Sequence, residues 1–346
     1  MISIVFGGLS YEHEISIVSA ITLKKVLASK SLQFLFLDAN RDFYLIDEKD
    51  MKSNYFASGS YEKAKKLYLL QGGFVSMGIL GHKKVEVGTI LNLVHGGDGE
   101  DGTLASLFDF YNLPFIGPRK EAAMGSFNKW FTKQFAQALN IKTVDYEILN
   151  RNDKYETKLS FPIIIKPLRL GSSIGVSVVK EADEFEYALD TAFEYDTQVM
   201  IEPFIAGVKE YNLAGCSGSN SITFSIIEEP AKAEFLDFEK KYLDFKRDGK
   251  SEDAALDNTL SQKMHDTFTS LYSPIFEGSL IRCDFFVIDN EVYLNEINPI
   301  PGSMANYLFE DFTSVIETLS QKLPRSHKIN VNYNYINKIQ SAKGKA

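Results

Sequence analysis

The sequence has very little cysteine, with only Cys216 and Cys283 in 346 residues. Two cysteines so far apart exclude a disulfide framework and a cysteine-based zinc motif, and they fit a reducing compartment. No stretch approaches the roughly 18 apolar residues that a membrane-spanning helix needs. The N-terminal MISIVFGG has neither the basic region nor the long apolar segment of a secretion signal. We therefore expect a cytoplasmic protein that does not cross a membrane.

An excess of positive charge is also lacking. The chain carries a formal net charge of −9, so general affinity for nucleic acid is not expected. Its 45% hydrophobic and 24% charged residues are typical of a soluble globular protein. The length predicts about two to three domains.

The N-terminal segment predicts the start of an α/β nucleotide-binding fold. Residues 2–6 form an apolar strand, Gly7 and Gly8 follow, and a helix is expected from about 12 to 27. The sequence GGLSYE lacks the G-x-G-x-x-G fingerprint, which makes a dinucleotide oxidoreductase a weak alternative. Glu12 lies in the first helical turn, where an acid considered alone is best explained by the helix dipole.

A second strand, glycine turn and helix follow at residues 89–111. The strand TILNLVH leads into GGDGEDG and then into a helix. Such glycine density indicates a close approach of the backbone to another group. His95 ends the strand, where α/β sheets place ligand-binding groups, but a hydrogen-bonded structural histidine is an equal alternative.

A single helix is predicted over residues 121–139, with the first domain boundary close by. Lys129 and Lys133 lie one turn apart on it, and lysines in such a pattern are usually solvated.

Two β-strands, at residues 161–166 and 176–180, flank a Gly/Ser loop. The loop is the tip of a hairpin and not a Walker loop, because no Gly-Lys-Ser/Thr precedes a helix. Its backbone N–H groups and hydroxyls can close over phosphates. Lys166 lies within the apolar run, where a buried ammonium needs an anionic partner. In the β-structure that follows, Glu202 and Glu210 could accept hydrogen bonds from the amino or ribose groups of a nucleotide.

Residues 282–302, RCDFFVIDNEVYLNEINPIPG, predict two short antiparallel strands with an acid in the middle of each. Hard divalent cations take oxygen ligands, so Asp284, Glu296 and Asn298 could hold a phosphate-bound Mg²⁺. Arg282 and the backbone N–H of Gly302 could stabilise an oxyanion. The alternative is an ordinary hairpin with two solvated acids.

The register of this hairpin decides whether the acids meet. A two-residue turn at Asp289 and Asn290 would pair Asp284 with Asn295 and put Glu296 on the wrong side. We therefore predict an odd-length or bulged turn that pairs Asp284 with Glu296. We also expect Val292, Leu294, Glu296 and Asn298 to share one face of the second strand.

The remaining segments give weaker predictions. Residues 50–75 are expected to be irregular, residues 234–249 to form a lid loop over a cleft, and residues 326–346 to be a frayed basic tail. Helices are expected over residues 184–195, 261–276 and 304–319.

The order of these segments resembles the D-alanine–D-alanine ligase family of the ATP-grasp superfamily. The resemblance covers roughly residues 2–320. Its most specific blocks are GGLSYEHEISIVSA, NLVHGGDGEDG, IIIKPLRLGSSIGVSVV, IEPFIAGVKEYNLA, FEKKYLD, IRCDFF and NEINPIPG. Several such blocks in one order are far more specific than any single block.

The resemblance implies a mixed α/β (α+β) ATP-grasp architecture, in which an N-terminal parallel α/β domain precedes two domains whose antiparallel sheets sandwich ATP. The implied division is an N-terminal substrate-binding domain at residues 1–118, a central subdomain with the glycine loop at 119–203, and a C-terminal subdomain with the lid and metal site at 204–346.

The resemblance also implies the residues of the site. ATP contacts would come from Lys129, Lys166, Glu202 and Glu210, and metal ligands from Asp284, Glu296 and Asn298. Glu12, Ser172 and Tyr242 would form a hydrogen-bonded set that closes the lid and orients the first D-alanine, whose ammonium group Glu12 would hold. His95 would lie near the first D-alanine, and Lys241 and Tyr307 near the second, with Tyr307 where the family often has serine. Arg282 and the Gly302 amide would be the oxyanion stabilisers.

The implied activity is ATP-dependent ligation of two D-alanine molecules through an acyl phosphate, for peptidoglycan precursor synthesis. Two Mg²⁺ ions, or Mn²⁺ in their place, and a homodimer are implied with it. Tyr242, in place of histidine, favours an amine nucleophile and hence a dipeptide product. The alternatives are another ATP-grasp carboxylate–amine ligase and a non-catalytic nucleotide-binding module.

Overall fold

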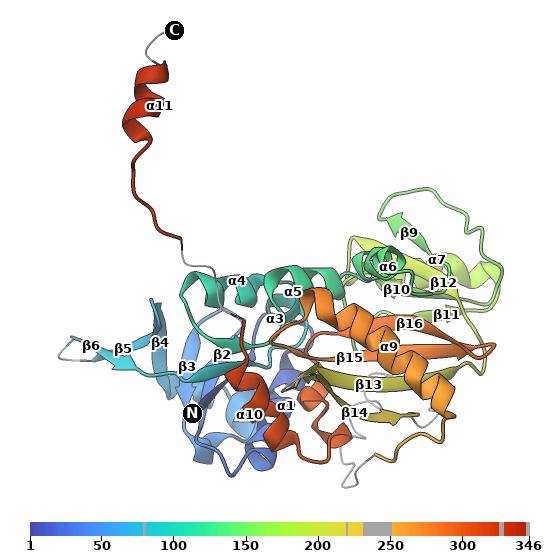
Figure 1. Ribbon diagram of the computed structural model, residues 1–346. Coiled ribbons are helices and arrows are strands. Elements are labelled where there is room, and N and C mark those ends of the chain that lie inside the picture. Colours follow the sequence, from blue (N-terminus) through green and yellow to red (C-terminus); the bar gives the residue numbers. More distant parts are fainter. Residues whose placement is uncertain (79–80, 219–220, 231–250, 325–328, 344–346) are drawn as a thin grey trace.

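Three β-sheets organise the part of the chain that the computed structural model describes, which is residues 1–78, 81–218, 221–230, 251–324 and 329–343 (Figure 1). One sheet has eight strands and the other two have four each. No helix in these ranges has the length and apolar character needed to cross a membrane.

The eight-stranded sheet has the strand order β6-β5-β4-β3-β2-β1-β7-β8. The pairs β2-β1, β1-β7 and β7-β8 are parallel, and the pairs from β2 out to β6 are antiparallel. Its strands are β1 Ile2–Gly7, β2 Leu32–Leu37, β3 Phe43–Ile46, β4 Lys65–Leu70, β5 Gly73–Gly78, β6 Gly81–Val85, β7 Thr89–Asn92 and β8 Phe115–Ile116. The helical segments of this part are α1 His13–Val26, η1 Glu48–Asp50, α2 Ser53–Ala57, η2 Ser60–Lys63, α3 Gly97–Glu100 and α4 Thr103–Phe110.

Helices cover both faces of this sheet, which explains why β1 is buried along its whole length. Ile4 and Phe6 belong to a core that includes α1, whereas Val5 belongs to a second core that includes α4. Successive side chains of a strand point to opposite faces, so a central strand covered on both sides shows no alternation.

The expectation that residues 50–75 are irregular is wrong. This range contains α2, β4 and the start of β5. Only Leu67 of β4 is buried, so the alternation of the strand is too weak to stand out in the sequence.

The second sheet is antiparallel and has the order β11-β10-β12-β9. Its elements are β9 Glu147–Asn150, β10 Ile163–Pro167, β11 Ser177–Val179, η3 Ala182–Glu184, α7 Phe185–Phe193 and β12 Gln198–Pro203. The third sheet, also antiparallel, has the order β14-β13-β15-β16. Its elements are β13 Lys209–Ser217, β14 Ile222–Glu228, α9 Asn258–Ile275, β15 Leu280–Ile288 and β16 Glu291–Asn298.

The single helix predicted over residues 121–139 is two helices, α5 Lys120–Phe127 and α6 Lys129–Ala138. Asn128 interrupts them with extended backbone dihedrals, and its side chain accepts hydrogen bonds from the N–H groups of Trp130 and Phe131. Asparagine is a strong N-cap because its side-chain oxygen satisfies such free donors. The break therefore starts a new helix at Lys129.

The C-terminal part of the described body returns to the first sheet. The predicted helix over 304–319 is a short 3₁₀ segment, η4 Gly302–Leu308, followed by α10 Phe312–Gln321. Met304 and Ile316 share a hydrophobic core with Ile4 and Phe6 of β1. The division at residues 118 and 203 stays a prediction, but α5 and α6 contribute Ala122 and Ala136 to the core of the third sheet.

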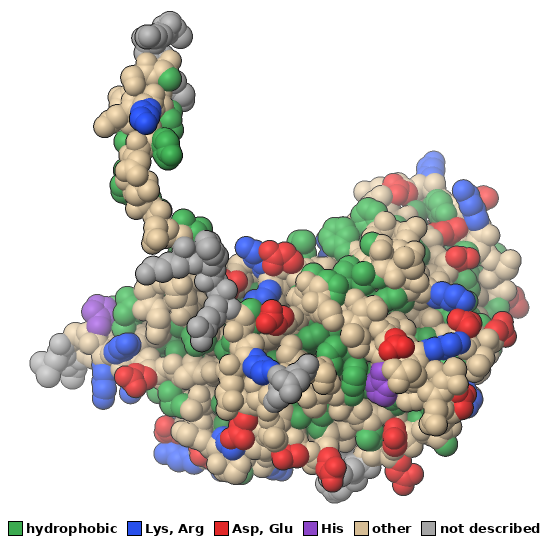
Figure 2. All heavy atoms as spheres, viewed as in Figure 1, with side chains coloured by type: hydrophobic (Ala, Val, Ile, Leu, Met, Phe, Trp, Pro, Cys, Tyr) green, Lys and Arg blue, Asp and Glu red, His purple; other side chains and the backbone are tan. Residues whose placement is uncertain are grey.

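Residues 329–343 stand apart from the body and include the helix α11 Ile336–Lys343 (Figures 1 and 2). A frayed tail was expected over residues 326–346, and the helix over residues 336–343 differs from that expectation.

Candidate active site

The hairpin of β15 and β16 brings the two predicted metal-binding acids together. Asp284 pairs with Glu296, whereas the next pair is Phe285 with Leu294, so Asn295 is the extra residue of a β-bulge. Opposed residues of an antiparallel pair lie on the same face of the sheet. The two carboxylates therefore face the same side, as expected.

The extra residue does not lie in the turn, so the predicted odd-length or bulged turn is wrong. Ile288 pairs with Glu291, which leaves a two-residue turn at Asp289 and Asn290 with φ values of 50° and 61°. Positive φ at both positions is typical of a type I′ turn, which matches the twist of the flanking strands.

The bulge also changes which side chains of β16 share a face. Val292 and Leu294 are buried in the core with Ile297, and Glu296 and Asn298 are only half-buried. The expectation that all four alternating residues lie on one face is therefore wrong. The bulge shifts the alternation by one residue between Leu294 and Glu296.

Asp284 is held by its neighbours on the same face. Arg282 Nε and Nη2 donate to its two carboxylate oxygens at 2.7 and 2.8 Å, and Asn298 Nδ2 donates at 3.0 Å. Burial alone would lower the pKa of Arg282, but the Asp284 carboxylate outweighs it and raises the pKa of the guanidinium. Arg282 is therefore a permanent cation beside the acids. Tyr307 lies close to Arg282, and burial raises the pKa of the Tyr307 phenol.

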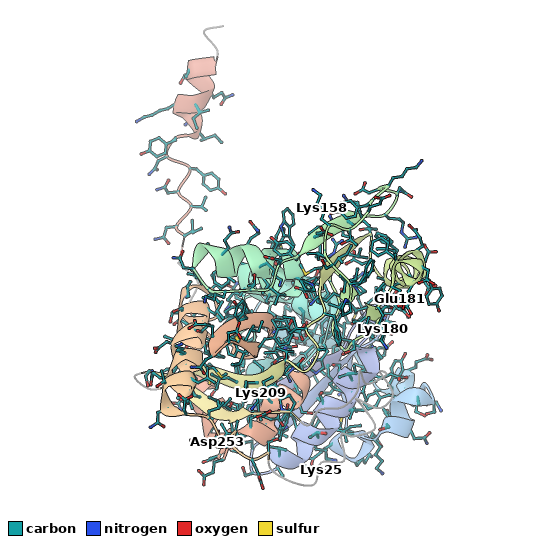
Figure 3. All side chains as sticks on the ribbon, turned by 90° about the vertical axis from the view of Figure 1, so that its right-hand side faces the viewer. Lys25, Lys158, Lys180, Glu181, Lys209 and Asp253 are labelled. Atoms are coloured by element: carbon teal, nitrogen blue, oxygen red, sulfur yellow. The ribbon has the colours of Figure 1, made fainter. Side chains whose placement is uncertain are left out.

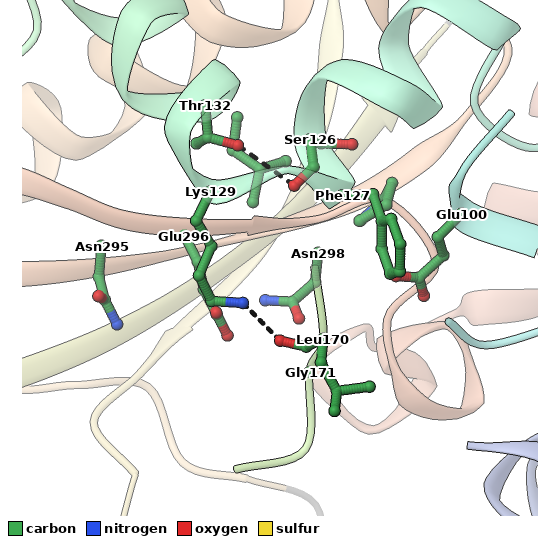
Figure 4. A pocket seen from close by; sticks show the side chains of 12 residues that line it. Glu100, Ser126, Phe127, Lys129, Thr132, Leu170, Gly171, Asn295, Glu296 and Asn298 are labelled. Atoms are coloured by element: carbon green, nitrogen blue, oxygen red, sulfur yellow. Dashed lines mark hydrogen bonds between the residues drawn. The ribbon is translucent and has the colours of Figure 1, made fainter. Parts of the chain in front are cut away.

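A small pocket opens between this hairpin, α6 and the glycine loop. Its volume is about 30 Å³, and its lining includes Lys129, Gly171, Glu296 and Asn298 (Figure 4). Lys129 Nζ donates to the carbonyl oxygen of Leu170. Burial lowers the pKa of the Lys129 ammonium, while Glu296 acts in the opposite direction. The pocket thus brings the Lys129 ammonium together with the side-chain oxygens of Glu296 and Asn298.

Glu100 lines the same pocket and was not predicted as a site residue. Burial raises the pKa of its carboxyl well above the ordinary value, and the charges of Glu12 and Glu296 add to that increase. Its place in the glycine-rich block GGDGEDG was the only available signal.

Two further lysines share one buried carboxylate. Glu202 Oε1 pairs with the ammonium of Lys133, and Glu202 Oε2 lies 2.5 Å from Lys166 Nζ. Burial would raise the pKa of Glu202, but the two lysines outweigh it and hold the pKa below its usual value. Lys133 is 3% exposed, so the expectation of a solvated lysine is wrong. Its long-range partner Glu202 cannot be recognised from the local pattern.

The glycine loop contacts the N-terminal domain through Glu12. Ser172 Oγ donates to Glu12 Oε1, which joins two members of the predicted lid-closing set. Ser172 and Ser173 both have a φ of 58°, the left-handed conformation that lets a tight tip fold toward a neighbour. Tyr242 and Lys241 lie outside the described residues.

His95 is buried three residues after the end of β7, and both of its ring nitrogens make hydrogen-bond contacts. Nδ1 lies 2.9 Å from the carbonyl oxygen of Ile300, and Nε2 lies 3.0 Å from Ser19 Oγ. Burial lowers the pKa of His95 to about 4. Ser19, another residue that was not predicted, also accepts a hydrogen bond from the Ser303 N–H at 3.0 Å.

The last two predicted residues differ in exposure. Gly302 begins η4 and is half-buried between the buried Pro301 and Ser303. Glu210 is the second residue of β13 and is exposed.

The donor set fits a magnesium ion. No three His, Cys, Asp or Glu side chains among the described ranges are arranged to hold a metal. Mg²⁺, however, needs only one or two protein carboxylates when phosphates supply the other oxygens. Asp284 and Glu296 lie on one face with the amide of Asn298, and these side chains would hold it.

Comparisons with known proteins match this architecture. The family models described as D-ala D-ala ligase N-terminus and D-ala D-ala ligase C-terminus match residues 1–118 and 135–314. The D-alanine--D-alanine ligase of Wolinella succinogenes is 56% identical over 344 residues, which is 99% of each chain. That of Campylobacter concisus is 55% identical over 343 residues, 99% of this chain and 98% of the relative.

A solved structure, the D-alanine-D-alanine ligase from Helicobacter pylori, is 51% identical with a TM-score of 0.84, covering 94% of this chain and 99% of its own. The ATP-grasp architecture expected from the sequence is thereby confirmed, with its parallel-containing first sheet and two antiparallel sheets. The chain belongs to the D-alanine–D-alanine ligase family.

Proposed function

We propose that this protein joins two D-alanine molecules to D-alanyl-D-alanine, with conversion of ATP to ADP and phosphate. The carboxylate of the first D-alanine takes the γ-phosphoryl group of ATP and becomes an acyl phosphate. The amine of the second attacks the acyl carbon, and the resulting tetrahedral oxyanion expels phosphate. Cytoplasmic peptidoglycan precursor synthesis by a homodimer is part of the proposal.

The single observation that carries this proposal is the opposition of Asp284 and Glu296 across the hairpin. The Asp284 carboxylate accepts from Arg282, and the Glu296 carboxylate lines the pocket that holds Lys129. Phosphoryl transfer depends mainly on positioning and neutralisation of charge. This cluster of charged side chains can provide both. Mg²⁺, or Mn²⁺, held by Asp284, Glu296 and Asn298 would neutralise phosphate charge there.

The other residues take roles around this cluster. Lys129 and Lys166 bind phosphate oxygens of ATP, and Glu202 and Glu210 contact the nucleotide. Glu12 and Ser172, which touch each other, orient the first D-alanine together with Tyr242. His95 lies near the first substrate, and Lys241 and Tyr307 lie near the second. Arg282 and the Gly302 N–H stabilise the oxyanion.

The decisive experiment is a coupled ADP-release assay with D-alanine, L-alanine and D-lactate, alone and in mixtures. We expect ADP release that requires D-alanine and yields a D-alanyl-D-alanine product by mass spectrometry. Release with another acid and amine, and none with D-alanine, would favour a different ATP-grasp ligase. Nucleotide binding without release would favour a non-catalytic module.

Substitution Arg282→Ala tests the oxyanion role. Loss of one such donor typically costs about 3 kcal/mol, so turnover should fall roughly a hundredfold or more while binding of an ATP analogue is retained. Lys142→Ala is the control, because Lys142 makes an exposed pair with Glu291 on the same hairpin. Unchanged turnover in Arg282→Ala would reject the role.

A further inference from the structure

The segment that carries Gly302 has an unusual backbone. Ser303, Met304 and Ala305 follow it with φ values of 47°, 54° and 49°, and all three are buried. Non-glycine residues occupy this left-handed region only when their surroundings hold them there. Something must therefore hold the turn in place.

Two side chains from the N-terminal part of the chain hydrogen-bond to the backbone of this segment, one before and one after Gly302. Ser19 Oγ accepts from the Ser303 N–H at 3.0 Å, after Gly302. His95 Nδ1 lies 2.9 Å from the carbonyl oxygen of Ile300, before Gly302. The two side chains are joined to each other by the 3.0 Å contact between Ser19 Oγ and His95 Nε2.

With a neutral His95 ring, the protons of this network have only one consistent arrangement. A carbonyl oxygen can only accept, so His95 Nδ1 carries the hydrogen and donates to Ile300. In the neutral ring Nε2 is then an acceptor, and the Ser19 hydroxyl donates to it. Burial lowers the pKa of His95 to about 4, which keeps the ring neutral at neutral pH. Every polar group in the network is satisfied.

The hydrogen bonds of Ser19 and His95 lie on either side of the one residue of this segment that is not buried. From Pro299 to Ala305 every residue is buried except Gly302, which is half-buried. Ile300 is 3% exposed, and Ser19 is 1% exposed. Buried polar contacts of this kind are rigid, so they fix the direction in which the Gly302 N–H points.

We propose that Ser19 is a positioning residue which, together with His95, clamps Ile300 and Ser303 and thereby aims the Gly302 N–H at the reacting carbonyl oxygen. The inference rests on the proposed ligase function and extends it to a residue outside the substrate-contacting set. It also gives His95 a positioning role, because both of its ring nitrogens are already engaged within the protein.

The test compares Ser19→Ala with a matched control, Ser16→Ala. Ser16 is a buried serine of the same helix whose hydroxyl bonds Gly7 N–H and the Leu93 carbonyl, away from the clamp. Misplacement of a catalytic group by about 1 Å costs on the order of a hundredfold. We expect Ser19→Ala to lower kcat roughly 10- to 100-fold with the KM for ATP unchanged. Ser16→Ala should keep kcat.

Two further variants protect this test against simple misfolding. Ser19→Thr retains the hydroxyl and should retain kcat within about threefold. If the added methyl group prevents folding, the double variant Ser19→Ala with His95→Gln decides. Residues that act as one unit are not additive, so the double variant should be little worse than Ser19→Ala alone. Wild-type kcat in Ser19→Ala, an equal loss in Ser16→Ala, or additive losses would overturn the proposal.

A measurement without turnover separates this proposal from the ligase function. Long-range ¹H–¹⁵N NMR of the histidine rings, with His95→Gln to assign the signal, should show His95 neutral with the proton on Nδ1. Ser19→Ala should shift the Nε2 resonance. A wild-type ring protonated on Nε2 would overturn the clamp whatever the activity, whereas absence of ligase turnover in the wild type would defeat the proposed function.

Discussion

At the scale of single residues, two of the lysines are buried, whereas lysines usually lie on the surface. Lys25, Lys158 and Lys209 are exposed (Figure 3), whereas Lys133 and Lys166 are buried around Glu202. Two ammonium groups sharing one carboxylate leave one positive charge unbalanced. A phosphate is the natural partner for such a charge.

Substitution Lys133→Ala should destabilise the fold. Lys166 still neutralises the Glu202 carboxylate, but Glu202 Oε1 is left buried without its partner, which typically costs about 1–3 kcal/mol. The exposed pair of Lys142 with Glu291, at 3.3 Å, is the control, and Lys142→Ala should cost about 1 kcal/mol or less. Urea unfolding gives both free energies. Equal values for the two variants would contradict the structural role of Lys133.

His95 should make stability sensitive to acid. The unfolded chain binds the proton near pH 6.5, whereas the folded protein binds it only near the lowered pKa of about 4. The unfolded state therefore holds more protons between these values, and the free energy of unfolding falls as the pH falls from 6.5 to 4. At about 1.4 kcal/mol per pKa unit, the loss attributable to His95 is about 3 kcal/mol.

The measurement is the free energy of unfolding at pH 7 and at pH 4.5. His95→Gln should lose less stability on acidification than the wild type, and the exposed His82→Gln serves as the control. The same loss in His95→Gln as in the wild type would show that the ring does not cause it.

At the scale of elements, short irregularities place the functional groups. The bulge at Asn295 lets a tight two-residue turn coexist with the pairing of Asp284 and Glu296. The break at Asn128 sets Lys129 at the first position of α6, where the loop carbonyls of Leu168 and Leu170 accept from its backbone N–H and its ammonium. A regular strand and a continuous helix would lose both arrangements.

Asn128→Ala should weaken both stability and nucleotide binding. Loss of an N-cap costs about 1 kcal/mol, since the N–H groups of Trp130 and Phe131 lose their acceptor. Asp257→Ala removes the equivalent cap of α9, which accepts from the Leu260 N–H at 2.9 Å. Both variants should lower the urea midpoint, but only Asn128→Ala should raise the KM for ATP, because Lys129 follows it. A raised KM in Asp257→Ala as well would contradict this specificity.

At the scale of the whole molecule, the first and last parts of the described body share one core. Ile4 and Phe6 of β1 pack in the same cluster as Met304, Phe312 and Ile316. The Ser19 contact to Ser303 crosses the same junction. The N-terminal sheet and the Gly302 segment therefore pack against each other as one unit.

Ile316→Ala should loosen the N-terminal sheet although Ile316 lies far away in sequence. Its side chain is fully buried, and such truncations typically cost about 2–5 kcal/mol. Hydrogen exchange of residues 2–7 should accelerate more than that of β10 and β12. Leu189→Ala, in the core of the second sheet, is the control and should show the opposite pattern. Equal acceleration of both regions in Ile316→Ala would contradict the shared core.

Much of the site could be predicted from the sequence, because its chemistry is local. The apolar runs around Lys166 and the acids of the 282–302 hairpin stand in the chain as readable patterns. Those patterns indicate the residue types of the site, the paired strands and the family that the chain resembles. The Glu12–Ser172 contact also followed from the family resemblance.

Only the tertiary structure decided the rest. The site of the bulge, the pairing of Lys133 with Glu202, and the clamp of Ser19 and His95 on the Gly302 segment depend on groups far apart in sequence. Local periodicity specifies which face of an element is apolar, but not which distant partner that face meets. Burial of a charge or a hydroxyl becomes favourable only with such a partner, so its role exists only in the folded chain.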